Sequence, residues 1–148
     1  MPLSAEDWVA IQELYARSAW TFDTGDAAGF VDTFTADGTL DMAQKHAGQA
    51  AITAFMADVL AKDPWLPYAQ HLVTGLQVTG DGSRATARAY VTRTHRLPGA
   101  NRGNCMVVWA GYSTDALSKT AAGWRFSART LRAWEGEVVA PIVRARTA

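Results

Sequence analysis

The sequence places an aspartate and a histidine where they could act together as an acid–base pair. Asp23 ends an amphipathic N-terminal segment just before Gly25, and His71 opens a segment rich in valine and threonine. A carboxylate bound to one imidazole nitrogen holds one tautomer, leaves the other nitrogen free as a base and stabilises the imidazolium. The residues therefore predict a catalytic dyad. Backbone capping by Asp23 and a satisfied strand-end His71 are the alternative.

A second histidine, His95, lies near the end of the next segment of the same kind. In the same cavity as His71, its imidazole could protonate a departing hydroxyl or polarise a carbonyl, and a solvated strand-end histidine is the alternative. His46 is expected in a loop, without a role. The histidines do not show the His-x-x-x-His spacing of metal ligands, so no metal is predicted. Motifs for dinucleotides, for nucleoside triphosphates and for serine hydrolases are absent, so no cofactor is expected.

Bulky apolar side chains are numerous enough to line a cavity for a ring-sized ligand. The candidates for substrate binding are Tyr15, Trp20, Met42, Phe55, Trp65, Tyr90, Trp109 and Tyr112. Packing in the core is the alternative for each of them. Arg129 and Arg132, both near the end of the chain, could bind a carboxylate or stabilise an enolate. At least one of the two is expected to be a surface charge, and Arg132 is counted among the binding candidates.

Length and charge limit the class of protein. A chain of 148 residues suits one domain with one core, and 14 lysines and arginines balance 14 aspartates and glutamates. No large positive field is therefore available to hold nucleic acid or an anionic membrane. The N-terminal residues lack a signal-peptide pattern, and no apolar run of about 18 residues could span a bilayer. A cytoplasmic location is expected, with Cys105 as a buried, inert thiol.

Three helices are expected to come first. The apolar residues of the N-terminal helix recur at spacings of three and four, and Ser4 with Asp7 supplies a capping signal at its start. Gly25 ends this helix and Asp26 can cap the next one. The expected elements are helices over about 5–23, 27–34 and 49–61, a turn over 36–38 and a short strand over 39–42.

From Gln70 the period changes to two, which indicates strands. Four strands are expected, over about 71–79, 84–95, 104–118 and 124–134, with a hairpin turn at Asp81-Gly82. His71, Val73, Gly75 and Gln77 are expected to share one face of the first strand. The pattern leaves open which face of the second strand lies beside His71. Helices followed by a strand meander indicate an α+β fold.

The order of these motifs resembles the SnoaL-like group of the NTF2-like superfamily. The segments that carry the resemblance are Tyr15–Asp26, Phe34–Gly38, Gly48 before a helix, His71–Gly75 and Gly123–Phe126. The resemblance implies an NTF2-like cone, in which three N-terminal helices pack on a strongly curved, mixed, mainly antiparallel sheet enclosing a pocket. The chain itself predicts one domain over 1–136 with a C-terminal tail over 137–148, and the resemblance implies a homodimer or homotrimer.

Two lyases of this superfamily are similar at the candidate site. Asp23, His71 and His95 match, in order and approximate spacing, the dyad aspartate, the dyad histidine and the second histidine of scytalone dehydratase. The run Ala10–Tyr15 resembles the segment that leads to the dyad aspartate in hexachlorocyclohexane dehydrochlorinase. The resemblance implies that His71 acts as the base, Asp23 orients it and His95 assists the departing hydroxyl.

Departures from these two enzymes limit the prediction. Phe22 and Met42 stand where the dehydratase has tyrosines, and Ser18 stands where the dehydrochlorinase has a cation. We therefore expect a different substrate. The sequence predicts a cofactor-independent lyase, with dehydratase-type elimination, for a small cyclic or polyketide-like compound. Since fold alone does not determine function, the alternatives are a ligand-binding or scaffold protein, including one like a dioxygenase small subunit, and an isomerase of the ketosteroid type.

Overall fold

The computed structural model describes residues 2–96, 99 and 104–135. Helices α1 (Ala5–Asp23) and α2 (Ala27–Val31) come first. Strands β1 (Phe34–Asp41) and β2 (Lys45–Ala47), helix α3 (Gln49–Lys62) and a 3-10 turn (Leu66–Tyr68) follow them. The chain then forms the strands β3 (Ala69–Gly80), β4 (Arg84–Arg96), β5 (Cys105–Thr120) and β6 (Gly123–Ala133). The expected positions of α1, α3 and the last four strands are confirmed to within a few residues.

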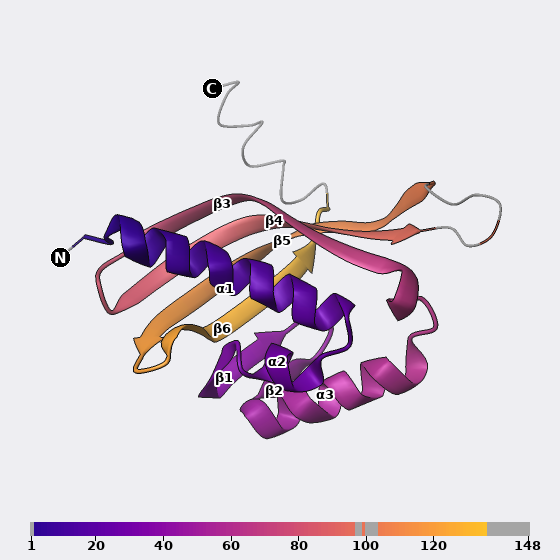
Figure 1. Ribbon diagram of the computed structural model, residues 1–148, viewed down its shortest axis with the longest axis horizontal. Helices are drawn as coiled ribbons and strands as arrows, with labels where there is room; N and C mark the ends of the chain where they lie inside the picture. The colour runs from indigo at the N-terminus through magenta and orange to yellow at the C-terminus, as the bar shows by residue number, and fades with distance from the viewer. Residues whose placement is uncertain (1, 97–98, 100–103, 136–148) are drawn as a thin grey trace.

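All six strands form one curved sheet in the order β2-β1-β6-β5-β4-β3. Each neighbouring pair is antiparallel except β1 and β6, which are parallel. Helix α1 lies across the sheet, and α2 and α3 gather with β1 and β2 near one end of it (Figure 1). The predicted α+β class, with helices on a mixed and mainly antiparallel sheet, is confirmed.

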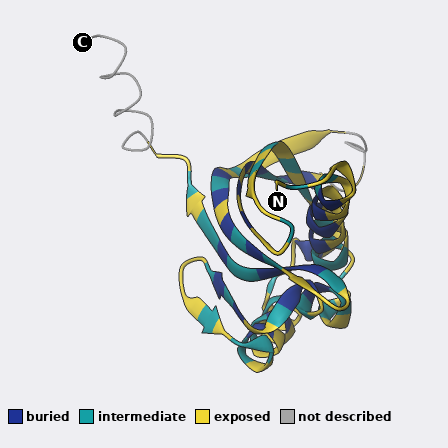
Figure 2. Cartoon of the chain, turned by 90° about the vertical axis from the view of Figure 1, so that its left-hand side faces the viewer, coloured by how far each residue is buried: buried dark blue, intermediate teal, exposed yellow. Residues whose placement is uncertain are grey.

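The apolar stripe of α1 packs on the sheet and forms the core. Figure 2 shows buried positions on the helix and along the strands. The largest side chains that are almost fully buried include Ile11, Phe34, Leu40, Ile52, Met56, Leu117 and Phe126. The helix begins with the expected capping box, in which Ser4 and Asp7 satisfy each other's backbone N–H groups. The core therefore sits between α1 and the long strands.

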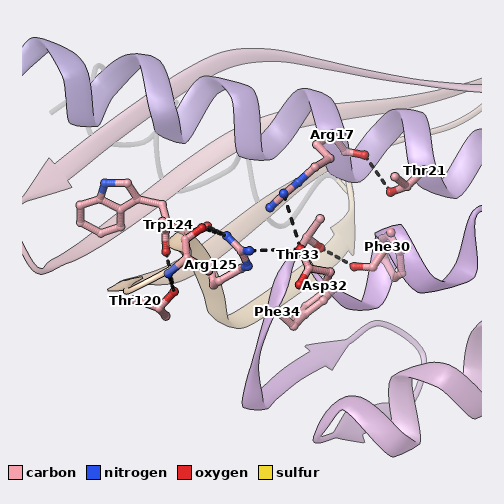
Figure 3. Close-up of polar contacts among 12 residues, drawn as sticks. Arg17, Thr21, Phe30, Asp32, Thr33, Phe34, Thr120, Trp124 and Arg125 are labelled. Carbon is pink, nitrogen blue, oxygen red and sulfur yellow. Dashed lines mark hydrogen bonds and ion pairs between the residues drawn. The ribbon is translucent and has the colours of Figure 1, made fainter.

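A polar cluster connects α1 and β6 to the end of α2 (Figure 3). Arg125 donates from Nη2 to Oδ2 of Asp32 at 3.1 Å, and Nη1 of Arg17 lies 3.6 Å from the same oxygen. Arg125 also donates from Nη1 to two backbone carbonyls of its own hairpin. Because Asp32 is 60% exposed, these ion pairs contribute little stability and mainly fix the position of the arginine.

The second helix ends earlier than the sequence predicts. It stops at Val31, and Phe34 is already the first residue of β1, so the expectation of helix through residue 34 is wrong. The backbone N–H of Phe126 donates to the carbonyl of Thr33 at 2.9 Å, and Phe34 pairs with Phe126. Because Thr33 and Phe34 make these long-range contacts with β6, they do not continue the helix. The predicted turn over 36–38 is instead a register irregularity within β1.

An irregularity in β3 changes which residues share the face of His71. Gly75 has a φ of 62°, and the pairing with β4 shifts register between Thr74 and Gln77. After this bulge the partly buried positions are Leu76 and Val78, while Gln77 is exposed. The expectation that Gln77 lies on the same side as His71 is therefore wrong.

Three expectations concern residues from position 97 onwards. Cys105 is exposed at the start of β5, so the prediction of a buried thiol is wrong. Most of the expected connection over 97–103 and the expected tail over 137–148 lie outside the described residues. No helix in the described ranges combines the length and the apolar character needed to cross a bilayer.

Candidate active site

The structure brings Asp23 and His71 together. Asp23 is the last residue of α1, and His71 is the third residue of β3. Oδ1 of Asp23 lies 2.5 Å from Nδ1 of His71, and Oδ2 accepts the backbone N–H of His71 at 2.8 Å. The two side chains are only 12% and 20% exposed. One carboxylate therefore holds both the ring and the backbone of the histidine.

This contact fixes what the imidazole can do. With Asp23 ionised, Nδ1 carries the proton that is shared with the carboxylate, and the lone pair is on Nε2. No side chain or backbone group in the described part of the chain forms a hydrogen bond with Nε2. The ring of Phe22 packs edge-on against the imidazole, with centroids 5.0 Å apart. His71 is thus an oriented base whose free nitrogen is available to a ligand.

A small apolar cavity of about 50 Å³ lies beside this base. Its lining residues come from α1, α2, the loop after β1, and the strands. They are Ser18, Ala19, Phe22, Phe30, Leu40, Met42, His71, Val73, Val91, Arg129 and Leu131. Ser18, His71 and Arg129 are the polar members of this set. A base and a guanidinium therefore border one apolar space.

Arg129 is buried, and its charge is compensated by neighbours. It donates from Nη1 to Oγ of Ser18 at 2.8 Å, and Nε lies 3.8 Å from Oδ1 of Asp115. Its guanidinium carbon lies 5.4 Å from the ring centroid of Tyr15 and 4.7 Å from that of Phe126. A planar cation held between aromatic rings and a carboxylate is pre-organised to meet negative charge that develops in the cavity.

A hydrogen-bond network behind the cavity holds Asp115. The hydroxyls of Tyr15 and Ser113 both donate to Oδ2 of Asp115, the second at 2.7 Å. Burial raises the pKa of Asp115, and the charge of Arg129 partly offsets this effect. Burial and the nearby charge of Asp115 raise the pKa of Tyr15 above its usual value. Tyr15 is therefore a protonated donor at neutral pH.

His95 lies on the same sheet face as His71 but outside the cavity lining. In the pairing of β3 with β4, Arg93 lies opposite His71 and His95 lies opposite Ala69. The Trp65 indole stacks on His95 with centroids 5.3 Å apart. Burial, and secondarily the charge of Arg93, lowers the pKa of His95, so its imidazole is neutral at pH 7. Its buried Nε2 has no hydrogen-bond partner among the described residues.

Of the other predicted binding residues near the helices, only one borders the cavity. Met42 borders the cavity. Phe55 lies farther back, where its ring centroid is 6.4 Å from that of Phe22. Tyr15 and Trp20 border a second hollow, a groove between α1 and β3. Trp65 is the residue that covers His95.

Three candidates lie on the opposite face of the sheet. Tyr90 pairs with Tyr112, and Tyr112 pairs with Arg132, at positions that alternate with the buried ones. Arg132 forms an ion pair with Asp41 at 3.1 Å on this exposed side. A fourth candidate, Trp109, pairs with Arg93 and so lies on the same face as His71, but its ring occupies the space that a side chain at residue 111 would need and does not line the cavity. The structure therefore places these residues outside the cavity.

Sequence reasoning weighed Arg129 but chose Arg132 for the site. The two residues are three apart on one strand, so they face opposite sides of the sheet. The signal that favours Arg129 is Asp115, which lies directly opposite it in the pairing of β5 with β6. Within the described ranges, no group of three histidine, cysteine, aspartate or glutamate side chains is arranged to hold a metal ion.

Comparison with solved structures identifies the fold. An NTF2-like protein with a cystatin-like fold from Novosphingobium aromaticivorans is 25% identical, with a TM-score of 0.75, over 93% of this chain and 88% of that one. A proposed aromatic ring hydroxylase from the same organism is 28% identical, with a TM-score of 0.75, over 90% and 92% of the two chains. A proposed scytalone dehydratase from this organism is 16% identical, with a TM-score of 0.71, over 86% and 84%.

Family comparison gives the same class. Residues 4–130 match the model of the SnoaL-like domain, so the chain belongs to the SnoaL-like domain family. The resemblance stated from the sequence motifs is thereby confirmed. Comparison with curated proteins gives no match.

Proposed function

We propose that this protein is a cofactor-independent lyase that removes water from small cyclic β-hydroxyketones, including polyketide-like compounds. The observation that carries the proposal is the 2.5 Å contact between Asp23 and His71 beside an apolar cavity. The contact leaves Nε2 of His71 as an oriented base beside a largely apolar space.

In the proposed reaction, Nε2 of His71 takes a proton from the carbon between the carbonyl and the hydroxyl-bearing carbon. The electron pair of that C–H bond forms an enolate, whose oxygen faces the guanidinium of Arg129. Collapse of the enolate forms the carbon–carbon double bond and expels the hydroxyl group, which leaves as water with the proton of the His71 imidazolium. Asp23 offsets the positive charge that His71 carries between the two steps.

A positioned general base contributes about 10²- to 10⁴-fold to such a reaction. The remaining acceleration comes from orientation in the cavity and from the fixed charge of Arg129. His95 was expected to assist the departing hydroxyl. Because Trp65 covers His95 and His95 lies outside the cavity lining, we assign the return of the proton to His71 instead.

Membership of the SnoaL-like family supports a small-ligand site in this cavity. The likeness to the proposed scytalone dehydratase supports the fold alone, since the identity is 16%. An isomerase would need the same base and the same stabilised enolate, but its substrate has no leaving group. A scaffold or binding protein would need neither His71 nor Arg129. These alternatives are outcomes of the following experiment.

The experiment measures turnover of two monocyclic ketones. Formation of cyclohex-2-enone from 3-hydroxycyclohexanone reports elimination, and its formation from cyclohex-3-enone reports isomerisation. We expect elimination by the wild type, a loss of at least about 100-fold in kcat/KM for His71→Ala, and wild-type activity for His46→Ala. His46 is a suitable control because it lies on β2, outside the cavity lining. Equal activity of His71→Ala and the wild type would refute the proposal.

We also propose that the protein is a homodimer that associates through the outer face of the sheet. Trp134 is 42% exposed and lies edge-on to Tyr90 and Tyr112, with ring centroids 5.6 and 6.1 Å away. An exposed aromatic cluster on a sheet face is typical of a surface that another subunit covers. This face is opposite to the cavity, so association leaves the site free.

A further inference from the structure

A buried ion pair lies behind the apolar cavity. The side chain of Asp115 is fully buried and that of Arg129 is 7% exposed, and Oδ1 of Asp115 lies 3.8 Å from Nε of Arg129. This separation is too long for a hydrogen bond, and neither atom has a hydrogen-bond partner in the described part of the chain. The two charges therefore compensate each other through space, and no direct hydrogen bond ties the guanidinium to the carboxylate.

The surroundings of Asp115 favour its ionised form. Oδ2 accepts from the hydroxyls of Tyr15 and Ser113, and the guanidinium of Arg129 faces Oδ1. Burial raises the pKa of Asp115, and these three neighbours act in the opposite direction. A buried carboxylate that accepts two hydrogen bonds beside a cation is paired, as buried charges generally are. Asp115 thus offsets the charge that Arg129 brings to the wall of the cavity.

Arg129 has donors that no protein group uses. Nη1 donates to Oγ of Ser18, whereas no acceptor among the described residues lies within hydrogen-bond distance of Nε or Nη2. A guanidinium with spare donors is a good binding group for a carboxylate or another stable anion. Such an anion would occupy the place where the proposed reaction forms its enolate. The site therefore needs a feature that disfavours stable anions.

The charges around the cavity supply this feature. The carboxylates of Asp23 and Asp115 and the guanidinium of Arg129 lie around His71 and the cavity. With His71 neutral, negative charge is in excess, so a bound anion would add a further negative charge in a largely apolar space. A neutral ketone adds none. Its enolate forms only as the proton moves to His71, so the net charge of the occupied site does not change.

We propose that Asp115 is a specificity-determining residue whose charge keeps stable anions out of the cavity, so that Arg129 meets only the negative charge formed during the reaction. This inference rests on the proposed function, because it assumes that an enolate forms beside Arg129. Asp115 does not line the cavity and acts through Arg129. Neutralising Asp115 should therefore create an anion-binding site.

The first test measures binding, which does not depend on turnover. The probes are acetate and acetamide, which have nearly the same shape, while only acetate is charged at pH 7. Asp115→Asn removes the charge and keeps the shape of the side chain, and Asp115→Asn/Arg129→Gln also removes the cation. Asp58→Asn is the matched control, since it removes the same charge from a side chain that is 58% exposed and does not border the cavity. Chemical-shift titration at constant ionic strength gives the affinities.

We expect Asp115→Asn to bind acetate at least about tenfold more tightly than the wild type does, and to bind acetamide equally well. Asp58→Asn should bind like the wild type, and the double variant should lose the gain. Because Asp115→Asn leaves a buried guanidinium unpaired, it should be less stable, and acetate should raise its Tm but not that of the wild type.

Two results would overturn the inference. One is an acetate affinity of Asp115→Asn no higher than that of the wild type. The other needs no variant: a wild type that binds acetate as tightly as acetamide does not exclude anions.

The second test measures turnover of 3-hydroxycyclohexanone and separates this inference from the proposed function. Acetate should raise the KM of Asp115→Asn without lowering kcat, and should leave both constants of the wild type unchanged. Acetate binding that depends on Asp115→Asn, together with no turnover by the wild type, would retain the exclusion of anions and refute the lyase. Turnover that acetate does not inhibit in Asp115→Asn would retain the lyase and refute the role of Asp115.

Discussion

The Asp23 carboxylate has two acceptor roles, and a substitution can separate them. Asp23→Asn keeps the shape and one carbonyl oxygen for the backbone N–H of His71, but it removes the charge that stabilises the imidazolium. We expect kcat/KM for 3-hydroxycyclohexanone to fall about 10²- to 10⁴-fold. The matched control is Asp26→Asn, because Asp26 caps α2 and does not contact His71. Similar losses in both variants would point to a general effect on the helix ends.

The Tyr15 hydroxyl is a second group whose role can be isolated. In Tyr15→Phe the ring remains in the core, but buried Asp115 loses one of its donors. We expect a loss of about 1–3 kcal/mol in the free energy of unfolding, measured with urea. Tyr112→Phe removes a hydroxyl on a partly exposed side chain and should change stability by less than about 0.5 kcal/mol. Equal stability of Tyr15→Phe and the wild type would contradict this account.

The sequence predicted the contact between Asp23 and His71 but not the position of Arg129 beside the cavity. The proximity of Asp23 and His71 followed from the order of motifs and from the family resemblance. The place of Arg129 depends on Asp115, which lies on another strand, and the register between those strands is set by the whole sheet. The expectation that at least one arginine is a surface charge is confirmed by exposed Arg132. Which arginine faces inward could not be read from strand period alone.

At the scale of elements, local patterns predicted α1, α3 and the long strands, because each has a clear apolar period and a cap or turn at its end. The bulge in β3 was not predicted. Gly75 alone does not show whether a strand continues regularly, since the bulge also needs Tyr90 on the neighbouring strand to pack beside it. Likewise, β2 has only three residues and too little pattern to be recognised.

The bulge should depend on glycine. A Cβ on residue 75 would lie 2.8 Å from Cδ2 of Tyr90, and the φ of 62° is unfavourable for other residues. Gly75→Ala should therefore lower the free energy of unfolding by at least about 1–2 kcal/mol. Gly82→Ala is the control, since a Cβ there meets nothing within 4 Å. A bulge that tolerates alanine would leave both variants equally stable in urea denaturation.

The anchor of α1 on the hairpin of β5 and β6 should make stability depend on pH. A hydrogen bond from Lys119, and secondarily one from Trp124, holds the pKa of Asp7 well below its usual value. A carboxyl whose pKa is lowered by folding stabilises the protein above its unfolded pKa of about 3.9, and this contribution is lost as the pH falls further. Asp7→Asn should therefore be less stable than the wild type at pH 7.

The difference in stability between Asp7→Asn and the wild type should shrink as the pH falls below about 4, because the wild type then loses its ionised Asp7. Thermal unfolding between pH 7 and pH 2.5 measures this change. Asp81→Asn tests a carboxyl whose pKa is lowered to about 2 by bonds within its own turn. The difference in stability between Asp81→Asn and the wild type should also shrink below about pH 4, although the turn that holds Asp81 does not anchor α1. A difference for Asp7→Asn that stays constant with pH would show that its charge is not the cause.

At the scale of the whole molecule, the fold class was predictable because helices come before a strand meander. The family resemblance implied a mixed sheet but did not indicate that β1 pairs with β6 in parallel, since these strands are far apart in the chain and no local signal records their contact. The division of the ligand space into a cavity and a groove was not predictable. Both spaces are lined by residues of α1 together with residues of distant strands, and the sequence alone does not show which of these residues meet.

The outer face of the sheet decides the oligomeric state in our proposal. Trp134 contacts both Tyr90 and Tyr112, so Trp134→Glu places a charge in the middle of the exposed aromatic cluster. Burying an unpaired charge in an interface is costly, so a homodimer should dissociate. Light scattering after gel filtration should give twice the mass of one chain for the wild type and a single chain for Trp134→Glu.

The matched control is Thr86→Glu, which adds the same charge on the same face of β4 at an exposed position away from the cluster. It should remain a dimer. Because the cavity lies on the other face, the Trp134→Glu monomer should retain turnover of 3-hydroxycyclohexanone, which separates association from catalysis. A wild type that is monomeric at micromolar concentration, or a Trp134→Glu variant that stays dimeric, would exclude this face as the interface.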